Sequence, residues 1–161
     1  MIVSKYYEAV QLIERLHRRF LDVMKVELDR RNIQDINNVQ SLILFNIAED
    51  ELTVGELTLR GYYLGSNVSY NVKKLVESGY LKQERSVHDK RSVRVSLSED
   101  KGIPLFKIVR DALQAQEEAI KATEMNDDKL SELISSLKML ERFWTTQTSF
   151  TGLDSIGNDW D

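Results

Sequence analysis

The spacing of apolar residues predicts a long helix near the N-terminus. Over residues 4–31, apolar side chains recur at steps of three and four, which is the spacing of one helical face. A helix of this length would span about 42 Å. Because that is long for a small domain, we expect part of it to pack on a second chain. The stripe consists of Tyr6, Val10, Ile13, Phe20 and Met24, with His17 in the same row.

Two shorter helices are predicted next. Residues 37–48 are mostly apolar, and either Asn37 or Asn38 is expected to cap this buried helix. The second helix starts at Thr53, because Glu56 three positions later completes a capping box.

The following stretch predicts a helix and then a hairpin. A turn over residues 61–65 leads into a helix at 66–78, which Gly79 ends. Two strands are expected at 80–86 and 92–98, most clearly in the second, where apolar and polar residues alternate. The polar and basic residues between the strands would form the hairpin tip.

Two helices are predicted near the C-terminus. Pro104 suits the first turn of a helix that runs to about Thr123, since its missing N–H needs no partner there. Asn126 is expected to cap a last helix that ends near residue 147, and the tail beyond it is expected to be disordered. The apolar face of the last helix comprises Leu130, Leu133, Ile134, Leu137, Leu140 and Trp144.

The order of these elements predicts the fold class. It is mainly α with a small β-hairpin wing, a winged helix–turn–helix set between long dimerisation helices. The expected divisions are 1–35 for an N-terminal dimerisation helix, 36–102 for the winged helix–turn–helix, 103–147 for C-terminal dimerisation helices and 148–161 for the tail.

Composition narrows the class of protein. Cysteine is absent, which excludes disulfides, thiol chemistry and cysteine-ligated zinc. The two histidines, His17 and His88, lie far apart in sequence, so we expect no metal site and no cofactor. No nucleophile–base pair or phosphate-binding loop indicates an enzyme. With no apolar run of membrane-spanning length and no secretory pattern, we expect a cytoplasmic protein that does not bind membranes.

The charge is unevenly distributed along the chain. The formal net charge is −4, yet residues 53–98 carry eight basic and four acidic groups, while the segments on either side are net acidic. A local basic face is sufficient for contacts with nucleic-acid phosphates. Ordinary fluctuation of surface charge would produce the same balance.

The predicted helix at 66–78 has two distinct faces. One is apolar and should dock on the domain, and the other carries groups that suit DNA: asparagine can read adenine, and lysine neutralises phosphate. A solvated surface helix would show the same pattern. The docked face comprises Val68, Val72, Leu75 and Val76, and the candidate DNA contacts are Ser66, Asn67, Ser69, Tyr70, Lys73 and Lys74.

The hairpin tip combines an acid and an arginine. Asp89 could hold Arg91 in a fixed pose, and a guanidinium held in this way suits a narrow minor groove. A solvated turn with a surface ion pair is the alternative. The other candidate DNA contacts of the hairpin are Arg85, Lys90 and Arg94.

Residues 66–98 resemble the MarR family of bacterial transcription regulators. One departure is that Gly102 lies one position farther along than the family's exit glycine, so we expect a shifted start of the next helix. Residues 61–71 are similar to an LdtR-like alphaproteobacterial subgroup of the family. The family pattern falls on Ser66, Val68 and Ser69, on Leu75, Val76, Gly79, Tyr80 and Leu81, on Asp89 and Arg91, and on Val95, Leu97 and Ser98.

The resemblance implies a transcriptional regulator that binds double-stranded DNA at an inverted repeat. It also implies a homodimer, and a small, partly apolar effector that changes the affinity for DNA. The alternative is a dimeric winged-helix module that binds protein rather than DNA. The family's ligand pocket lies between the dimer helices and the winged domain, which points to His17, Phe20, Ser41, Phe45 and Phe106.

Overall fold

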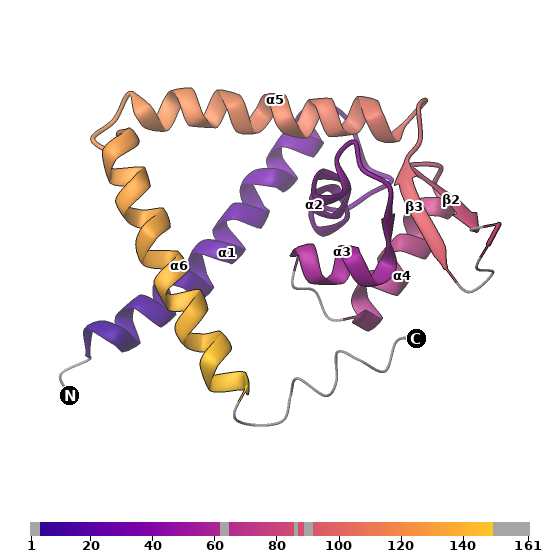
Figure 1. Cartoon of the computed structure of the whole chain (residues 1–161). Coiled ribbons are helices and arrows are strands. Elements are labelled where there is room, and N and C mark those ends of the chain that lie inside the picture. The colour runs from indigo at the N-terminus through magenta and orange to yellow at the C-terminus, as the bar shows by residue number, and fades with distance from the viewer. Residues whose placement is uncertain (1–3, 62–64, 86, 89–91, 150–161) are drawn as a thin grey trace. The chain divides into compact units, whose positions relative to one another are not determined.

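The protein is described by a computed structural model that covers residues 4–61, 65–85, 87–88 and 92–149. Two compact units, Met1–Ala112 and Leu113–Asp161, divide the chain within one long helix. In chain order, the described elements are α1 (Lys5–Arg30), α2 (Asn38–Ile47), β1 (Leu52–Thr53), α3 (Val54–Gly61), α4 (Gly65–Glu77), β2 (Leu81–Arg85), β3 (Val93–Leu97), α5 (Gly102–Lys121) and α6 (Asp127–Ser149) (Figure 1).

The first unit is built on one hydrophobic core. Helices α2, α3 and α4 gather beside the small sheet, and the end of α1 and the start of α5 complete the core (Figure 1). The fold class is therefore confirmed as mainly α with a β wing. Side chains exposed by no more than 1% include Ile43, Leu44, Ile47, Leu57, Val68, Leu75 and Val95.

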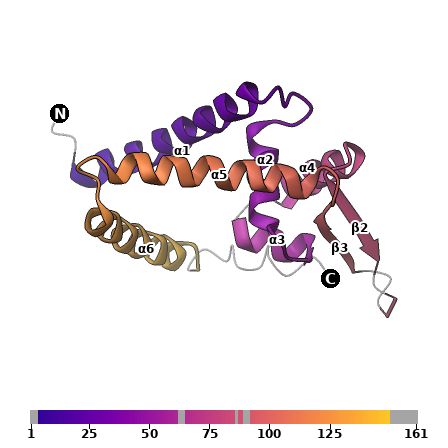
Figure 2. The ribbon, with the colours of Figure 1, turned by 90° about the horizontal axis from the view of Figure 1, so that it is seen from above.

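The sheet has three strands, one more than the alternation of residues predicts. Its order is β1-β3-β2 and both pairings are antiparallel. Strand β1 contributes only Leu52 and Thr53, which lie opposite Val95 and Arg94. Strands β2 and β3 run side by side as the predicted hairpin (Figure 2). The short third strand ties the middle of β3 to the residues just before α3.

The predicted caps at the helix ends are confirmed. The Asn37 side-chain oxygen accepts a hydrogen bond from the backbone amide of Gln40 at 2.8 Å and caps the start of α2. Thr53 and Glu56 form the reciprocal capping box of α3. Gly79 has φ +82° just after α4, in the left-handed region that favours glycine. Asn126 caps α6 through a 3.0 Å bond from the Lys129 amide.

The apolar stripe of α6 is partly exposed and partly half-buried. None of the α6 side chains that the structure describes is buried, and Leu133, Ile134 and Leu137 are 42 to 50% exposed. Helix α6 runs to Ser149, slightly past its expected end, and the rest of the expected tail lies outside the described residues. In the first unit, the N-terminal half of α1 likewise exposes Tyr6, Leu12 and Leu16 among others.

Candidate nucleic-acid interface

Helix α4 separates a docked face from an open one. Val68 and Leu75 are fully buried and Val72 is 5% exposed, so this face is fixed in the core. The side chains on the opposite face are exposed, as the helical wheel predicts. They are Ser66, Asn67, Ser69, Tyr70, Lys73 and Lys74.

The two lysines of this open face differ in their surroundings. The Lys74 ammonium lies 3.6 Å from a Glu77 carboxylate oxygen and 5.7 Å from the centre of the Tyr70 ring. Lys73 makes no ion pair with any residue that the structure describes. Lys73 is therefore the less engaged of the two cations and the better placed to meet an external phosphate.

The β2–β3 hairpin is buried at its base and in the middle of β3, and it is exposed along most of β2. Leu81, Val95 and Leu97 are buried, whereas the β2 residues after Leu81 are all exposed. Arg85 on β2 and Arg94 on β3 are exposed, and Arg94 lies opposite Glu84 in the strand register. The tip residues Asp89, Lys90 and Arg91 lie outside the described residues.

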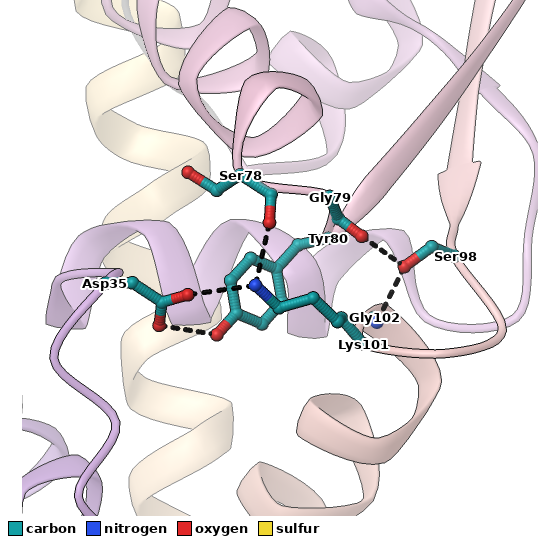
Figure 3. A network of polar contacts seen from close by, with 7 residues as sticks. All are labelled: Asp35, Ser78, Gly79, Tyr80, Ser98, Lys101 and Gly102. Carbon is teal, nitrogen blue, oxygen red and sulfur yellow. Dashed lines mark hydrogen bonds and ion pairs between the residues drawn. The ribbon is translucent and has the colours of Figure 1, made fainter.

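A network of polar contacts joins three separate segments of the first unit (Figure 3). The Tyr80 hydroxyl donates to one Asp35 oxygen at 2.6 Å, and the Lys101 ammonium donates to the other at 3.0 Å. Lys101 also donates to the Ser78 carbonyl at 2.8 Å and lies 4.5 Å from the Tyr80 ring centre. These contacts connect the α1–α2 loop, the end of α4 and the start of α5.

The network shifts the titration of two of its members. Partial burial opposes ionisation of Asp35, but the hydrogen bonds from Tyr80 and Lys101 outweigh it and lower the pKa of this carboxyl. Burial, and then the hydrogen bond to Asp35, raise the pKa of the Tyr80 phenol well above its ordinary value. At neutral pH, the pair is therefore a carboxylate accepting from a neutral phenol.

Ser98 adds two hydrogen bonds between the residues after α4 and the start of α5. Its hydroxyl donates to the Gly79 carbonyl at 2.6 Å and accepts from the Gly102 amide at 2.9 Å (Figure 3). A Cβ at Gly102 would lie 2.2 Å from the Tyr80 carbonyl oxygen, so only glycine allows this approach. Helix α5 begins at Gly102 itself.

The residues predicted to bind an effector are only partly brought together. The rings of Phe45 and Phe106 stack with centroids 5.7 Å apart, and Ser41 is fully buried one turn before Phe45, its hydroxyl bonded to the Asn38 carbonyl. Phe20 is half-buried and His17 is exposed on α1. Two surface cavities, of about 130 and 270 Å³, are lined by other residues.

Sequence reasoning missed the roles of Asp35, Lys101 and Gln40. Each acts through a partner far along the chain, so no local pattern reveals it. The sequence of α2 does not single out Gln40 either, because Asn38, Ser41 and Asn46 are polar in the same helix. Within the described residues, no group of three acidic, histidine or cysteine side chains could hold a metal, and no helix has the length and apolar character of a membrane span.

Comparison with known proteins decides the family. Residues 34–92, which include α4 and the start of the hairpin, match the model of the MarR family. The transcriptional activator of exopolysaccharide II synthesis ExpG, from Rhizobium meliloti strain 1021, is 38% identical over 139 residues, covering 86% of this chain and 71% of that protein. The chain belongs to the MarR family. It is accordingly a transcriptional regulator rather than a member of an enzyme family.

Solved structures of MarR-type regulators share the fold. Streptococcus pneumoniae FabT, in complex with DNA, superposes with a TM-score of 0.72 at 18% identity, covering 89% of this chain and 99% of that one. Staphylococcus aureus MarR, in complex with salicylate and kanamycin, gives 0.67 at 23% identity, covering 91% and 99%. The family model and the ExpG relative confirm the resemblance to the MarR family, whereas the LdtR-like subgroup stays a prediction.

Proposed function

We propose that this MarR-family regulator binds double-stranded DNA through α4 and the β2–β3 hairpin. The observation that carries the proposal is the division of α4, whose three buried side chains fix its orientation while its polar and basic face stays open. An exposed helix of this kind suits entry into the major groove. The FabT structure, solved as a complex with DNA, supports the same use of the fold.

Within this proposal, each candidate residue has a distinct role. Asn67 and Tyr70 lie near the start of α4 and read base edges, while Ser66 and Ser69 contact the DNA beside them. Lys73 and Lys74 hold phosphates further along the helix. In the hairpin, Asp89 orients Arg91 for the minor groove, and the remaining cations, Arg85, Lys90 and Arg94, add charge toward the backbone.

The proposal includes a homodimer and an inverted-repeat operator. The exposed apolar side chains of α6 and of the N-terminal half of α1 favour burial against a second copy of the chain. A two-fold dimer carries two copies of α4. Their half-sites would lie one helical turn apart, about 10 base pairs centre to centre.

A small, partly apolar effector completes the proposal. Ser41 and the stacked pair Phe45–Phe106 form one side of the proposed pocket, and His17 and Phe20 come from the dimerisation helix α1. The salicylate complex of Staphylococcus aureus MarR supports an aromatic carboxylate as the ligand class. Such a ligand changes DNA binding only if its affinity differs between two openings of the dimer.

The deciding experiment is binding to DNA from the protein's own promoter region at two salt concentrations. Affinity that falls steeply with salt and exceeds the affinity for unrelated DNA is the expected result, because phosphate contacts release counterions. The competing function is a winged-helix module that binds protein. Absence of any DNA complex at low salt would favour that module and overturn the proposal.

A further inference from the structure

A chain of side-chain amides links the start of α2 to the start of α4. Gln40, which is 9% exposed, is one of two buried polar side chains among the described residues. Its carbonyl oxygen accepts from the Asn37 backbone amide at 3.1 Å, and its amide nitrogen donates to the Asn71 side chain at 3.2 Å. The Asn71 amide nitrogen in turn donates to the Asn67 carbonyl at 2.8 Å.

The geometry points to Gln40 and Asn71 as positioning residues for base reading by Asn67. This inference rests on the proposed function of α4. Reading a base edge requires a side chain held to within about 0.5 Å, and residues behind the reader supply that constraint. Asn71 bonds the backbone of Asn67 directly, and Gln40 fixes Asn71 relative to α2.

Both the oxygen and the nitrogen of the Gln40 side-chain amide are hydrogen-bonded, so the position of this amide is fixed. Its oxygen is held in the capping box of α2, where Asn37 and Gln40 bond each other reciprocally. Its nitrogen therefore projects toward α4 from a fixed point. The apolar contacts of Val68, Val72 and Leu75 fix the rotation of α4 about its axis. The Gln40–Asn71–Asn67 hydrogen bonds fix the position of its first turn.

Helix α2 also contains a residue that serves as a matched control for Gln40. Asn38 is a part-buried amide two positions before Gln40, and its nitrogen donates to the Leu21 carbonyl of α1 at 2.9 Å. It crosses between helices as Gln40 does, yet it leads away from α4. Asn38→Ala therefore removes an interhelical amide bond without touching the Asn71–Asn67 link.

The test compares base discrimination across variants of the full-length protein. Binding is measured to the footprinted operator and to a set of operators with one base pair changed in each half-site. We expect Gln40→Leu and Asn71→Ala to lose about fivefold to tenfold in discrimination at the position where Asn67→Ala loses it. Discrimination elsewhere and the salt slope should stay as in the wild type, because no phosphate contact changes.

Two further measurements separate positioning from a loss of folding. The double variant of Gln40→Leu and Asn71→Ala should discriminate between bases no worse than whichever single variant discriminates less. This is expected because both residues act through the same series of hydrogen bonds. Asn38→Ala should discriminate like the wild type even where its thermal stability is lower. Asn71 is only half-buried, so Asn71→Ala tests the inference even if Gln40→Leu fails to fold.

The outcomes against the inference are distinct from those against DNA binding itself. Wild-type discrimination in both Asn71→Ala and Gln40→Leu overturns the positioning role and leaves the proposed function intact. Loss spread evenly over all positions, as for a protein that is partly unfolded, also overturns it. A wild-type protein that binds no promoter DNA overturns the proposed function first.

Discussion

The Tyr80 hydroxyl donates a 2.6 Å hydrogen bond to Asp35, a residue 45 positions earlier in the chain. Tyr80 is buried between α4 and β2, and Asp35 lies in the loop before α2. Lys101, at the start of α5, bonds the same carboxylate. One carboxylate therefore holds together the two ends of the helix–turn–helix and the helix that leaves it.

Removing the phenol oxygen tests this link. Tyr80→Phe keeps the buried ring and its contact with Lys101, so we expect the free energy of unfolding to fall by only about 1 kcal/mol at pH 7. Urea denaturation measures the change. In a protein that already carries Asp35→Ala, the same substitution should cost almost nothing, and an equal cost in both backgrounds would contradict the link.

The pH dependence of stability follows from the two pKa shifts. Because the pKa of Asp35 is lowered by folding, its contribution is present above its unfolded value of about 3.9 and is lost as pH falls through the folded-state value. The pKa of Tyr80 is raised, so its contribution is present below about pH 10 and is lost as pH rises further. The stability gap between wild type and Asp35→Ala should be widest between about pH 5 and 9.

Gly102 should tolerate no side chain. Gly102→Ala places a methyl group against the Tyr80 carbonyl and the Leu97 backbone, so we expect a loss of about 3 kcal/mol or more in the free energy of unfolding. Gly55→Ala is the matched control. At that position the nearest atom to a new Cβ is 3.9 Å away, and thermal unfolding should be unchanged or slightly raised.

The residues on the open face of α4 should fall into two groups, those that determine the preferred base sequence and those that hold the DNA phosphates. Asn67→Ala should relax base preference at one position in each half-site. Lys73→Ala should weaken binding to all DNA sequences about equally and reduce the slope of affinity against salt concentration, on logarithmic axes, by about one unit. Binding to operator variants over a salt series measures both effects. Unchanged base preference in Asn67→Ala would show that α4 is not the reader.

The hairpin tip should depend on Arg91 more than on Lys90. A guanidinium fixed in the minor groove is expected to contribute about 1–3 kcal/mol, whereas a mobile lysine supplies one phosphate contact. Asp89→Ala should weaken binding by releasing Arg91. Titration of the operator with each variant measures these differences, and equal small losses for Arg91→Ala and Lys90→Ala would argue against the wing model.

The apolar face of α6 should form part of a dimer interface. Light scattering at micromolar concentration should give a dimer for the wild type, and Leu137→Glu should weaken it, because that side chain is 42% exposed on the apolar stripe. Ser135→Glu places the same charge on the opposite face of α6 and should leave the dimer intact. A stable wild-type monomer would also remove the basis for an inverted-repeat operator.

Local patterns in the sequence predict the helices well. The caps at Asn37, Thr53 and Asn126 each act within three residues, so their signals are complete in a short stretch. The two faces of α4 follow from helical periodicity alone. The side chains that this periodicity assigns to the open face of α4 are exposed in the structure.

Contacts between distant residues could not be predicted in the same way. Strand β1 has two residues, too few for an alternating pattern, and exists because β3 pairs with it. Asp35 and Lys101 are 66 positions apart, and nothing in either neighbourhood marks the ion pair. The stacking of Phe45 on Phe106 likewise joins α2 to α5 across 61 positions, which no local pattern specifies.

Strand β2 of the hairpin is held in the core only at its start. The buried side chains of the hairpin are Leu81 and Leu97 at its base and Val95 in the middle of β3, and the residues of β2 that follow Leu81 are exposed. Pairs of residues inserted toward the tip would therefore lengthen the arm without opening the core or changing which face is buried. The reach of the hairpin can therefore change while the helical core and its buried side chains stay the same.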